Sequence, residues 1–191
     1  MGKFLVATRK KKHLAKNNMA QISGGLVLIA TLARLLPHPP NFAPIGAIAL
    51  FGGARLGRWW GLVITLGAMF LSDTIIGFHS GMWHVYAAFV ITYFIGRSFR
   101  TSVTVPNVLG GSLVASAVFF LITNFGVWME GFWLPTHMYP LTMNGLLTSY
   151  VMGIPFFGAT LASDLLYSGA LFSAYALVQY KMQVTKQPHF A

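Results

Sequence analysis

LSDTIIGFHSGMWHVY, residues 71–86, lies where one long apolar run ends and the next begins. The first run carries a single acid, Asp73, near its end, and it stops at Gly77. A short polar segment follows, and the next apolar run starts at Trp83 and His84. A carboxylate, imidazoles and an indole are thereby placed together at the expected surface of a membrane. We interpret this stretch as one wall of a small-molecule binding site.

The composition of the whole chain predicts an integral membrane protein. Of its 191 residues 55% are hydrophobic and 8% are charged, whereas a soluble domain has about 25% charged residues. The net charge of +10 does not indicate nucleic-acid binding, because six of the thirteen basic residues lie in the first sixteen positions. The others follow the ends of apolar runs, which is typical of a topology signal. The chain has no cysteine, so it has no disulfide and no thiolate metal site.

The apolar runs predict six transmembrane helices with both termini in the cytoplasm. We expect these helices at residues 21–36, 42–54, 59–77, 84–99, 108–129 and 154–180. In this topology every Lys and Arg except Arg34 lies on the cytoplasmic side, as the positive-inside rule requires. The basic segment before the first run resembles a signal peptide, but Arg34 and Pro37 leave no clean cleavage site. We therefore expect an uncleaved first span.

The fold class expected is an all-α integral membrane bundle with one membrane domain. Residues 1–20 are interpreted as a basic cytoplasmic tail, residues 21–180 as the six-helix domain and residues 181–191 as a second cytoplasmic tail. A longer connection precedes the last span. Its later part, residues 141–152, predicts an additional interfacial or re-entrant helix.

The three acids of the chain and its one displaced base fall in the outer half of this topology. They are Asp73, Glu130, Asp164 and Arg34. Ionisable groups inside a bilayer are costly, and they usually face a partner or a water-filled cavity. We therefore expect a pocket that is open to the outside and closed toward the cytoplasm. In the alternative interpretation, the two aspartates are structural and pair with Arg34 or cap a helix end.

Aromatic and amide side chains on the same side would complete such a pocket. Trp83, Trp128 and Tyr167 would supply flat apolar walls, and Asn124 shares a helix face with Trp128. The alternative is that the aromatic residues form an interfacial belt, which is common in membrane proteins.

No catalytic motif accompanies these residues. The sequence lacks the HExxH, GxSxG and GxxxxGK[ST] patterns, and the glycine-rich residues 52–58 lack the Lys-Ser/Thr of a phosphate-binding loop. If the protein pumps a substrate, the energy comes from another subunit. His79 and His84 could ligate a metal, but a loop spacing of five residues is unspecific.

Five segments together resemble a family of small bacterial inner-membrane proteins. They are LLPHPPNFAPIGAIALFGGA (35–54), LSDTIIGFHSGMWHVYAAFVITYFIGR (71–97), FFLITNFGVW (119–128), MYPLTMNGLL (138–147) and IPFFGATLASDLLYSGALF (154–172). That family is similar to the substrate-binding S components of energy-coupling-factor vitamin transporters, and nearest to the solitary cobalamin-transporting type. The resemblance implies a six-helix bundle with an outward-facing site, which is roofed by the loop after the first helix.

The resemblance implies that residues 38–42 form this roof and that the outer ends of spans three to six line the site. Together with the polar and aromatic residues described above, this gives the predicted substrate-binding residues. They are His38, Asn41, Phe42, Asp73, His79, Ser80, Trp83, His84, Tyr86, Asn124, Trp128, Asp164 and Tyr167. In the cobalamin-handling relatives a cysteine in the loop after the third span binds the cobalt, whereas this chain has Ser80 in that loop. Serine is a poor ligand for a soft metal. Either His79 or His84 would then contact the cobalt, or the substrate differs.

The leading hypothesis is a binding and uptake protein for a vitamin-like molecule, with cobalamin or a related corrinoid as the specific candidate. This protein would have no intrinsic cofactor. Its partners would be the substrate, the lipid bilayer, and either transmembrane and ATPase subunits of the energy-coupling-factor type or none. The alternatives are a membrane-embedded enzyme that uses the outer His/Asp cluster and a non-catalytic assembly subunit.

Overall fold

The computed structural model describes residues 19–57 and 59–184, and within these residues it is helical and contains no strand. The first helix is Met19–Arg34. It is followed by α2 (Ile45–Arg55), α3 (Trp60–Ile76), α4 (Met82–Ser98), α5 (Val105–Met129), the short 3₁₀-helix η1 (Glu130–Phe132) and α6 (Met143–Val184). The predicted all-α class is confirmed. Most of the N-terminal tail and the last seven residues of the C-terminal tail lie outside the described residues.

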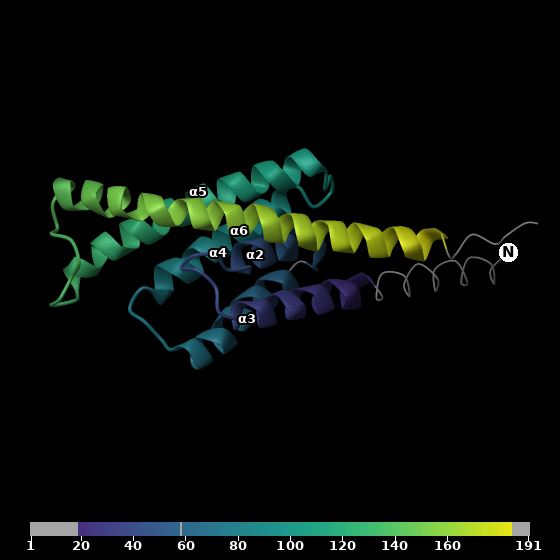
Figure 1. Cartoon of the computed structure of the whole chain (residues 1–191), viewed down its shortest axis with the longest axis horizontal. Helices are drawn as coiled ribbons and strands as arrows, with labels where there is room; N and C mark the ends of the chain where they lie inside the picture. Colours follow the sequence, from purple (N-terminus) through teal and green to yellow (C-terminus); the bar gives the residue numbers. More distant parts are fainter. Residues whose placement is uncertain (1–18, 58, 185–191) are drawn as a thin grey trace, which may run out of the picture.

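The helices run along one long axis, with α5 and α6 antiparallel and side by side (Figure 1). The described chain begins and ends at the same end of this bundle (Figure 1). The opposite end carries the connections at residues 35–44, 77–81 and 133–142, and we call it the loop end.

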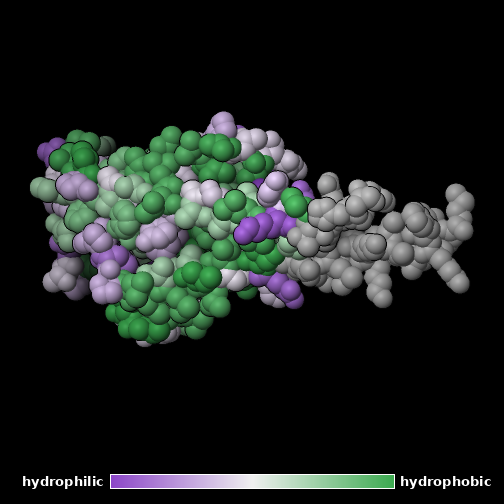
Figure 2. Space-filling model, turned by 45° about the vertical axis from the view of Figure 1, so that its right-hand side comes forward, coloured by the Kyte–Doolittle hydropathy of each residue, from purple (hydrophilic) through white to green (hydrophobic). Residues whose placement is uncertain are grey.

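Two helical segments are long and apolar enough to cross a membrane: Val105–Phe132, which joins α5 to η1, and α6. Only 28% and 22% of their most apolar windows are buried, whereas the core helix of a soluble protein is mostly buried. Large hydrophobic side chains are exposed elsewhere too, such as Ile75 at 71%. On the face shown in Figure 2, hydrophobic residues cover much of the middle and hydrophilic residues gather toward the ends. This surface suits an apolar solvent better than water.

The short helix α2 is the centre of the bundle. Every residue from Ile45 to Ala54 is buried, and α3, α4, α5 and α6 all pack against it. The helix has 11 residues, which at 1.5 Å per residue gives about 17 Å. The sequence predicted a span at residues 42–54. The structure shows a helix that covers about half of a bilayer core of ~30 Å and faces other helices on all sides.

Two glycines bring α2 and α4 into contact. A β-carbon on Gly53 would overlap the backbone oxygen of Tyr93, and one on Gly96 would overlap the backbone oxygen of Leu50. Because neither residue has a side chain, the two backbones touch directly, as small residues allow between helices in membranes.

The last helix corrects the prediction of a separate interfacial segment at residues 141–152. From Met143 onward these residues are the start of α6, which continues without a break for 42 residues. Pro155 lies inside this helix and removes only one backbone hydrogen bond. Packing against α5 supports the helix before the proline, where Ser149 Oγ donates to Asn124 O at 2.7 Å. The other predicted spans agree with helices of the structure within about three residues.

Candidate functional site

Two adjoining chambers lie inside the bundle toward the loop end. The outer chamber has a volume of about 430 Å³ and the inner chamber about 310 Å³. The residues that line both chambers are Asn41, His79, Val85, Phe119 and Thr160. The two chambers therefore adjoin each other along these five residues.

Two connections at the loop end position Asn41 and His79, which are polar residues that line both chambers. Residues 39–42 form a turn in which the Phe42 N–H donates to Pro39 O at 3.0 Å. Asn41 occupies this turn with a φ of 60°, a left-handed conformation that asparagine tolerates better than most residues. Gly77 ends α3 with a φ of 112° and turns the chain toward His79.

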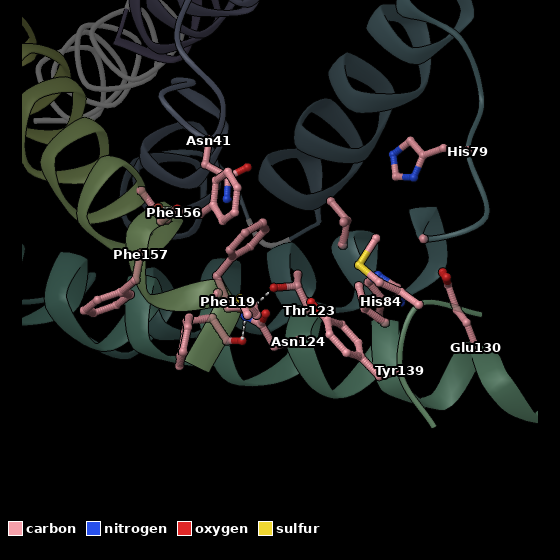
Figure 3. Close-up of a pocket in the computed structure, with 18 of the residues that line it drawn as sticks. Asn41, His79, His84, Phe119, Thr123, Asn124, Glu130, Tyr139, Phe156 and Phe157 are labelled. Carbon is pink, nitrogen blue, oxygen red and sulfur yellow. Dashed lines mark hydrogen bonds between the residues drawn. The ribbon is translucent and has the colours of Figure 1, made fainter. Parts of the chain in front are cut away.

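The walls of the outer chamber are phenylalanines from α5 and α6, as Figure 3 shows in part. The Phe120 ring lies 5.2 Å from the Phe157 ring, centroid to centroid, and Phe119 packs on Phe89 at 5.2 Å. The polar groups on the chamber surface come from the connections at the loop end and from α4, α5, η1 and α6. They are Asn41, His79, Ser80, His84, Thr123, Asn124, Glu130, Tyr139 and Thr160. An apolar cavity with a few polar groups is the usual form of a small-molecule site.

Glycines on neighbouring helices make room for two of these polar side chains. A β-carbon on Gly126 would overlap the His84 ring, and one on Gly153 would overlap Asn124 Oδ1. His84 is buried, and within the described residues its Nδ1 atom has no hydrogen-bond partner. Asn124 donates its amide to Phe120 O at 2.8 Å. The positions of both side chains therefore depend on the absence of a methyl group opposite them.

His79 and His84 approach each other beside Gly81. A β-carbon placed on Gly81 would lie 2.8 Å from His84 Nε2 and 3.3 Å from His79 Nδ1. Within the part of the chain that the structure describes, no group of three or more His, Cys, Asp and Glu side chains is placed to hold a metal. The two imidazoles can donate to or accept from a ligand in the outer chamber.

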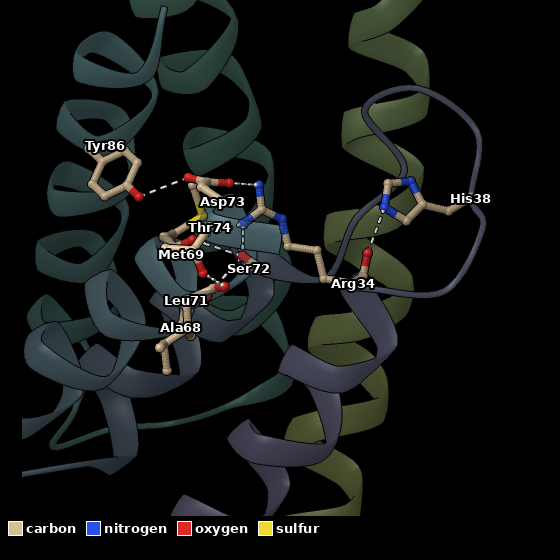
Figure 4. A network of polar contacts seen from close by, with 9 residues as sticks. All are labelled: Arg34, His38, Ala68, Met69, Leu71, Ser72, Asp73, Thr74 and Tyr86. Carbon is tan, nitrogen blue, oxygen red and sulfur yellow. Dashed lines mark hydrogen bonds and ion pairs between the residues drawn. The ribbon is translucent and has the colours of Figure 1, made fainter. Parts of the chain in front are cut away.

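Asp73 belongs to a separate polar network beside the inner chamber (Figure 4). Arg34 Nη2 lies 2.8 Å from Asp73 Oδ1, and Tyr86 donates its hydroxyl to Asp73 Oδ2 at 2.8 Å. Arg34 also donates to Ser72 Oγ and to Met69 O. The Asp73 side chain is 3% exposed and both its oxygens have partners. The interpretation that Asp73 pairs with Arg34 is confirmed.

Asp164 has no such network. It lines the inner chamber, is 4% exposed, and accepts a hydrogen bond from Ser116 Oγ on Oδ2 at 2.7 Å. A β-carbon on Gly46, near the start of α2, would overlap its Oδ1. Within the described residues, no Arg, Lys or His nitrogen lies within ion-pair distance of this carboxylate. Asp164 is therefore a buried carboxylate with one donor and no cation.

Seven of the thirteen predicted site residues line a chamber. They are His38, Asn41, His79, Ser80, His84, Asn124 and Asp164. The loop residue His38 lines the inner chamber, where its ring nitrogens lie 3.2 Å from Arg34 O and 3.0 Å from Pro39 O.

The other six predicted residues lie outside both chambers. Two of them, Asp73 and Tyr86, belong to the network around Arg34. The remaining four brace the loop end through three contacts. Phe42 packs on Tyr167 with ring centroids 6.0 Å apart, Trp83 packs on Trp133 at 5.7 Å, and Trp128 Nε1 donates to Pro140 O at 3.1 Å.

Sequence reasoning missed eight aromatic and polar residues that line the outer chamber. They are Phe119, Phe120, Thr123, Glu130, Tyr139, Phe156, Phe157 and Thr160. Glu130 had a signal, because it is one of only three acids and was predicted to lie on the outer side. The phenylalanines had none, since a phenylalanine in an apolar run can face lipid, the core or a cavity equally well.

The described residues form an all-helical bundle with two helical segments long and apolar enough to cross a membrane and with two adjoining chambers. The chain belongs to the family of unknown function DUF6580, whose model matches residues 15–187. No curated protein and no solved structure matches the chain.

Proposed function

We propose that this protein is a multi-pass protein of the bacterial inner membrane that binds a vitamin-like small molecule from the periplasmic side and takes part in its uptake. The observation that carries the proposal is the pair of adjoining chambers. Their volumes of about 430 and 310 Å³ fall within or near the ~300–1,000 Å³ of small-molecule sites. Their lining of phenylalanines with a few polar groups supports binding of a compact, partly aromatic molecule.

The positions of the charges support a topology in which the loop end is periplasmic. Arg55 and Arg97 lie in the last turns of α2 and α4, and the Arg55 guanidinium stacks over the Tyr175 ring at 4.6 Å. Lys181 lies in the last turn of α6. These basic residues lie away from the loop end, as expected of the cytoplasmic side. The start and the end of the described chain at one end agree with an even number of crossings.

The chamber volumes support a substrate smaller than an intact corrinoid. Cobalamin, which the family resemblance suggests, would fit only if the connections at residues 35–44 and 77–81 moved outward to enlarge the outer chamber. Of the two histidines on the outer chamber His79 is exposed and His84 is buried, so His79 is the more accessible to a cobalt atom.

The enzyme alternative gains no support from the described residues. It requires a His/Asp cluster, but Asp73 is engaged with Arg34 and Tyr86. Asp164 lines the inner chamber with His38 and His79, but within the described residues neither histidine is within ion-pair distance of its carboxylate. The assembly-subunit alternative provides no reason for an internal cavity with polar walls.

The test is to identify small molecules that the purified protein retains. The protein would be extracted in mild detergent from cells grown in vitamin-rich medium, and denatured samples would be analysed by mass spectrometry and by absorbance for a corrin. The Gly153→Ala variant introduces a methyl group that overlaps Asn124 Oδ1, whereas Gly158→Ala on the same helix meets nothing within 4 Å.

We expect wild type and Gly158→Ala to retain the same molecule in comparable amounts. Gly153→Ala should retain about tenfold less, because overpacking of 1–3 kcal/mol is of the order of a tenfold change in affinity. Absence of any retained molecule, together with unchanged vitamin uptake in a deletion strain, would refute the proposal.

A further inference from the structure

Apart from the histidines His38, His79 and His84, the ionisable groups of the two chambers include more acids than bases. The inner chamber contains Arg34, but Asp73 already neutralises it at 2.8 Å. The remaining acids are Asp164 in the inner chamber and Glu130 in the outer one. A buried carboxylate without a counter-ion is costly in an apolar environment. A positively charged ligand would supply a counter-ion.

We propose that the inner chamber receives a positively charged group of the substrate, a protonated amine or a quaternary ammonium, and that Asp164 binds it. This inference rests on the proposed function, since it specifies the substrate of the same cavity.

The surroundings of Asp164 leave one oxygen free for this role. Ser116 satisfies Oδ2, and Oδ1 lies against the backbone of Gly46. The N-terminus of α2 starts at Ile45, so its partial positive charge lies near the carboxylate and compensates part of the negative charge. Within the described residues, no α2 backbone N–H completes a hydrogen bond to this carboxylate.

The rest of the inner chamber suits an organic cation better than a metal ion. Its walls include Phe89, Phe119 and Met69, and aromatic faces attract ammonium groups. A volume of about 310 Å³ is far larger than a bare ion needs. In the described part of the chain, no third acidic or imidazole ligand completes a metal site there. The hydroxyl of Thr160 can accept a hydrogen bond from an ammonium N–H.

The test compares three probes of similar shape and different charge. Benzylamine is a cation at pH 7, benzyl alcohol is neutral and benzoate is an anion. Their binding to purified protein in detergent would be measured by thermal stabilisation across a concentration series, for wild type, Asp164→Asn and Glu130→Gln. Asparagine keeps the size of aspartate and a carbonyl that can accept from Ser116, while it removes the charge.

We expect benzylamine to stabilise wild type and to bind at least tenfold more tightly than benzyl alcohol or benzoate. Asp164→Asn should weaken benzylamine binding about tenfold or more, and Glu130→Gln should change it much less. If Asp164→Asn does not fold, Gly46→Ala replaces it, because the added methyl group displaces the carboxylate without removing its charge.

Two results would overturn the inference. One is equal or tighter binding of benzyl alcohol or benzoate to wild type. The other is unchanged benzylamine binding in Asp164→Asn, as expected of an acid that keeps its own proton. Either result leaves the proposed function intact, because a small molecule still binds in the cavity. Failure of all three probes also contradicts the inference, and the retained-molecule measurement then decides the proposed function separately.

Discussion

Asp73 and Asp164 are both buried aspartates in the half of the bundle that carries the loop end, yet their surroundings are opposite. Asp73 is held by a guanidinium and a phenol that occupy both its oxygens. Asp164 has a single hydroxyl donor and a cavity beside it. The difference shows that burial alone does not define the role of a carboxylate. A partner from the protein makes it structural, and the lack of one leaves it available to a ligand.

The two aspartates also lie in different regions of the bundle. The Asp73 network ties the first helix to α3 and α4 through Arg34 and Tyr86. The Asp164 site lies where α2, α5 and α6 meet. Loss of the Asp73 carboxylate should therefore mainly lower stability, and loss of the Asp164 charge should mainly change ligand binding.

The largest expected effect comes from breaking the ion pair. Asp73→Ala leaves the Arg34 guanidinium without its counter-ion, and loss of one partner of a largely buried pair costs about 3 kcal/mol. Detergent-solubilised protein should show a correspondingly lower unfolding free energy in a denaturant titration. Asp164→Asn, which breaks no ion pair, is the matched control and should lose less. Equal losses in the two variants would contradict the distinction between the two carboxylates.

Gly46→Ala should have the next largest effect. Its methyl group would overlap Asp164 Oδ1, and such overpacking costs about 2 kcal/mol. Gly158→Ala meets nothing within 4 Å and should be neutral or slightly stabilising, because alanine favours helix. The melting temperatures of the two variants, measured side by side, check this prediction. A Gly46→Ala variant as stable as Gly158→Ala would mean that Asp164 does not lie against α2.

The smallest effects should come from removing one hydrogen bond at each carboxylate. Tyr86→Phe removes a donor from Asp73, which keeps its guanidinium, so we expect a loss of about 1 kcal/mol. Ser116→Ala removes the one described donor of Asp164, and the loss should be about 1.5 kcal/mol, because the buried charge is left unsatisfied. Unfolding free energies of the two variants in the absence of ligand give the comparison. The reverse order would show that Asp164 is not charged in the free protein.

The sequence predicted the bounds of most helices well, but it did not predict that the short α2 is the buried centre of the bundle. The apolar runs around residues 59–77 and 84–99 are bounded by Gly77 and by arginines, and α3 and α4 agree with them closely. The short α2 is as apolar as a lipid-facing span, so its sequence carries no sign that protein surrounds it on all sides. Likewise, the sequence placed residues 141–152 in a separate segment, but these residues pack against α5 and α6 is continuous.

The candidate site likewise contains residues that could be predicted from the sequence and residues that could not. Polar residues such as His79, Asn124 and Asp164 could be selected from sequence, because a polar group in an apolar chain needs a reason. The choice between Asp73 and Asp164 could not be made, since it depends on which carboxylate Arg34 reaches. The tryptophans were selected as walls, but phenylalanines such as Phe157 take that role.

The most direct test of the account is the accessibility of the outer chamber from the periplasmic side. The chain has no native cysteine, so a single engineered cysteine reports without background. Ser80→Cys and Thr123→Cys place thiols on the outer chamber, and Ser102→Cys places one in the turn between α4 and α5, away from the loop end.

In spheroplasts treated with a small membrane-impermeant maleimide, we predict labelling of Ser80→Cys and Thr123→Cys, and labelling of Ser102→Cys only after the membrane is permeabilised. Ligand-rich medium should slow the labelling of Thr123→Cys. The opposite pattern of sidedness, or a Thr123→Cys thiol that stays unlabelled in permeabilised membranes, would contradict an outward-facing binding cavity.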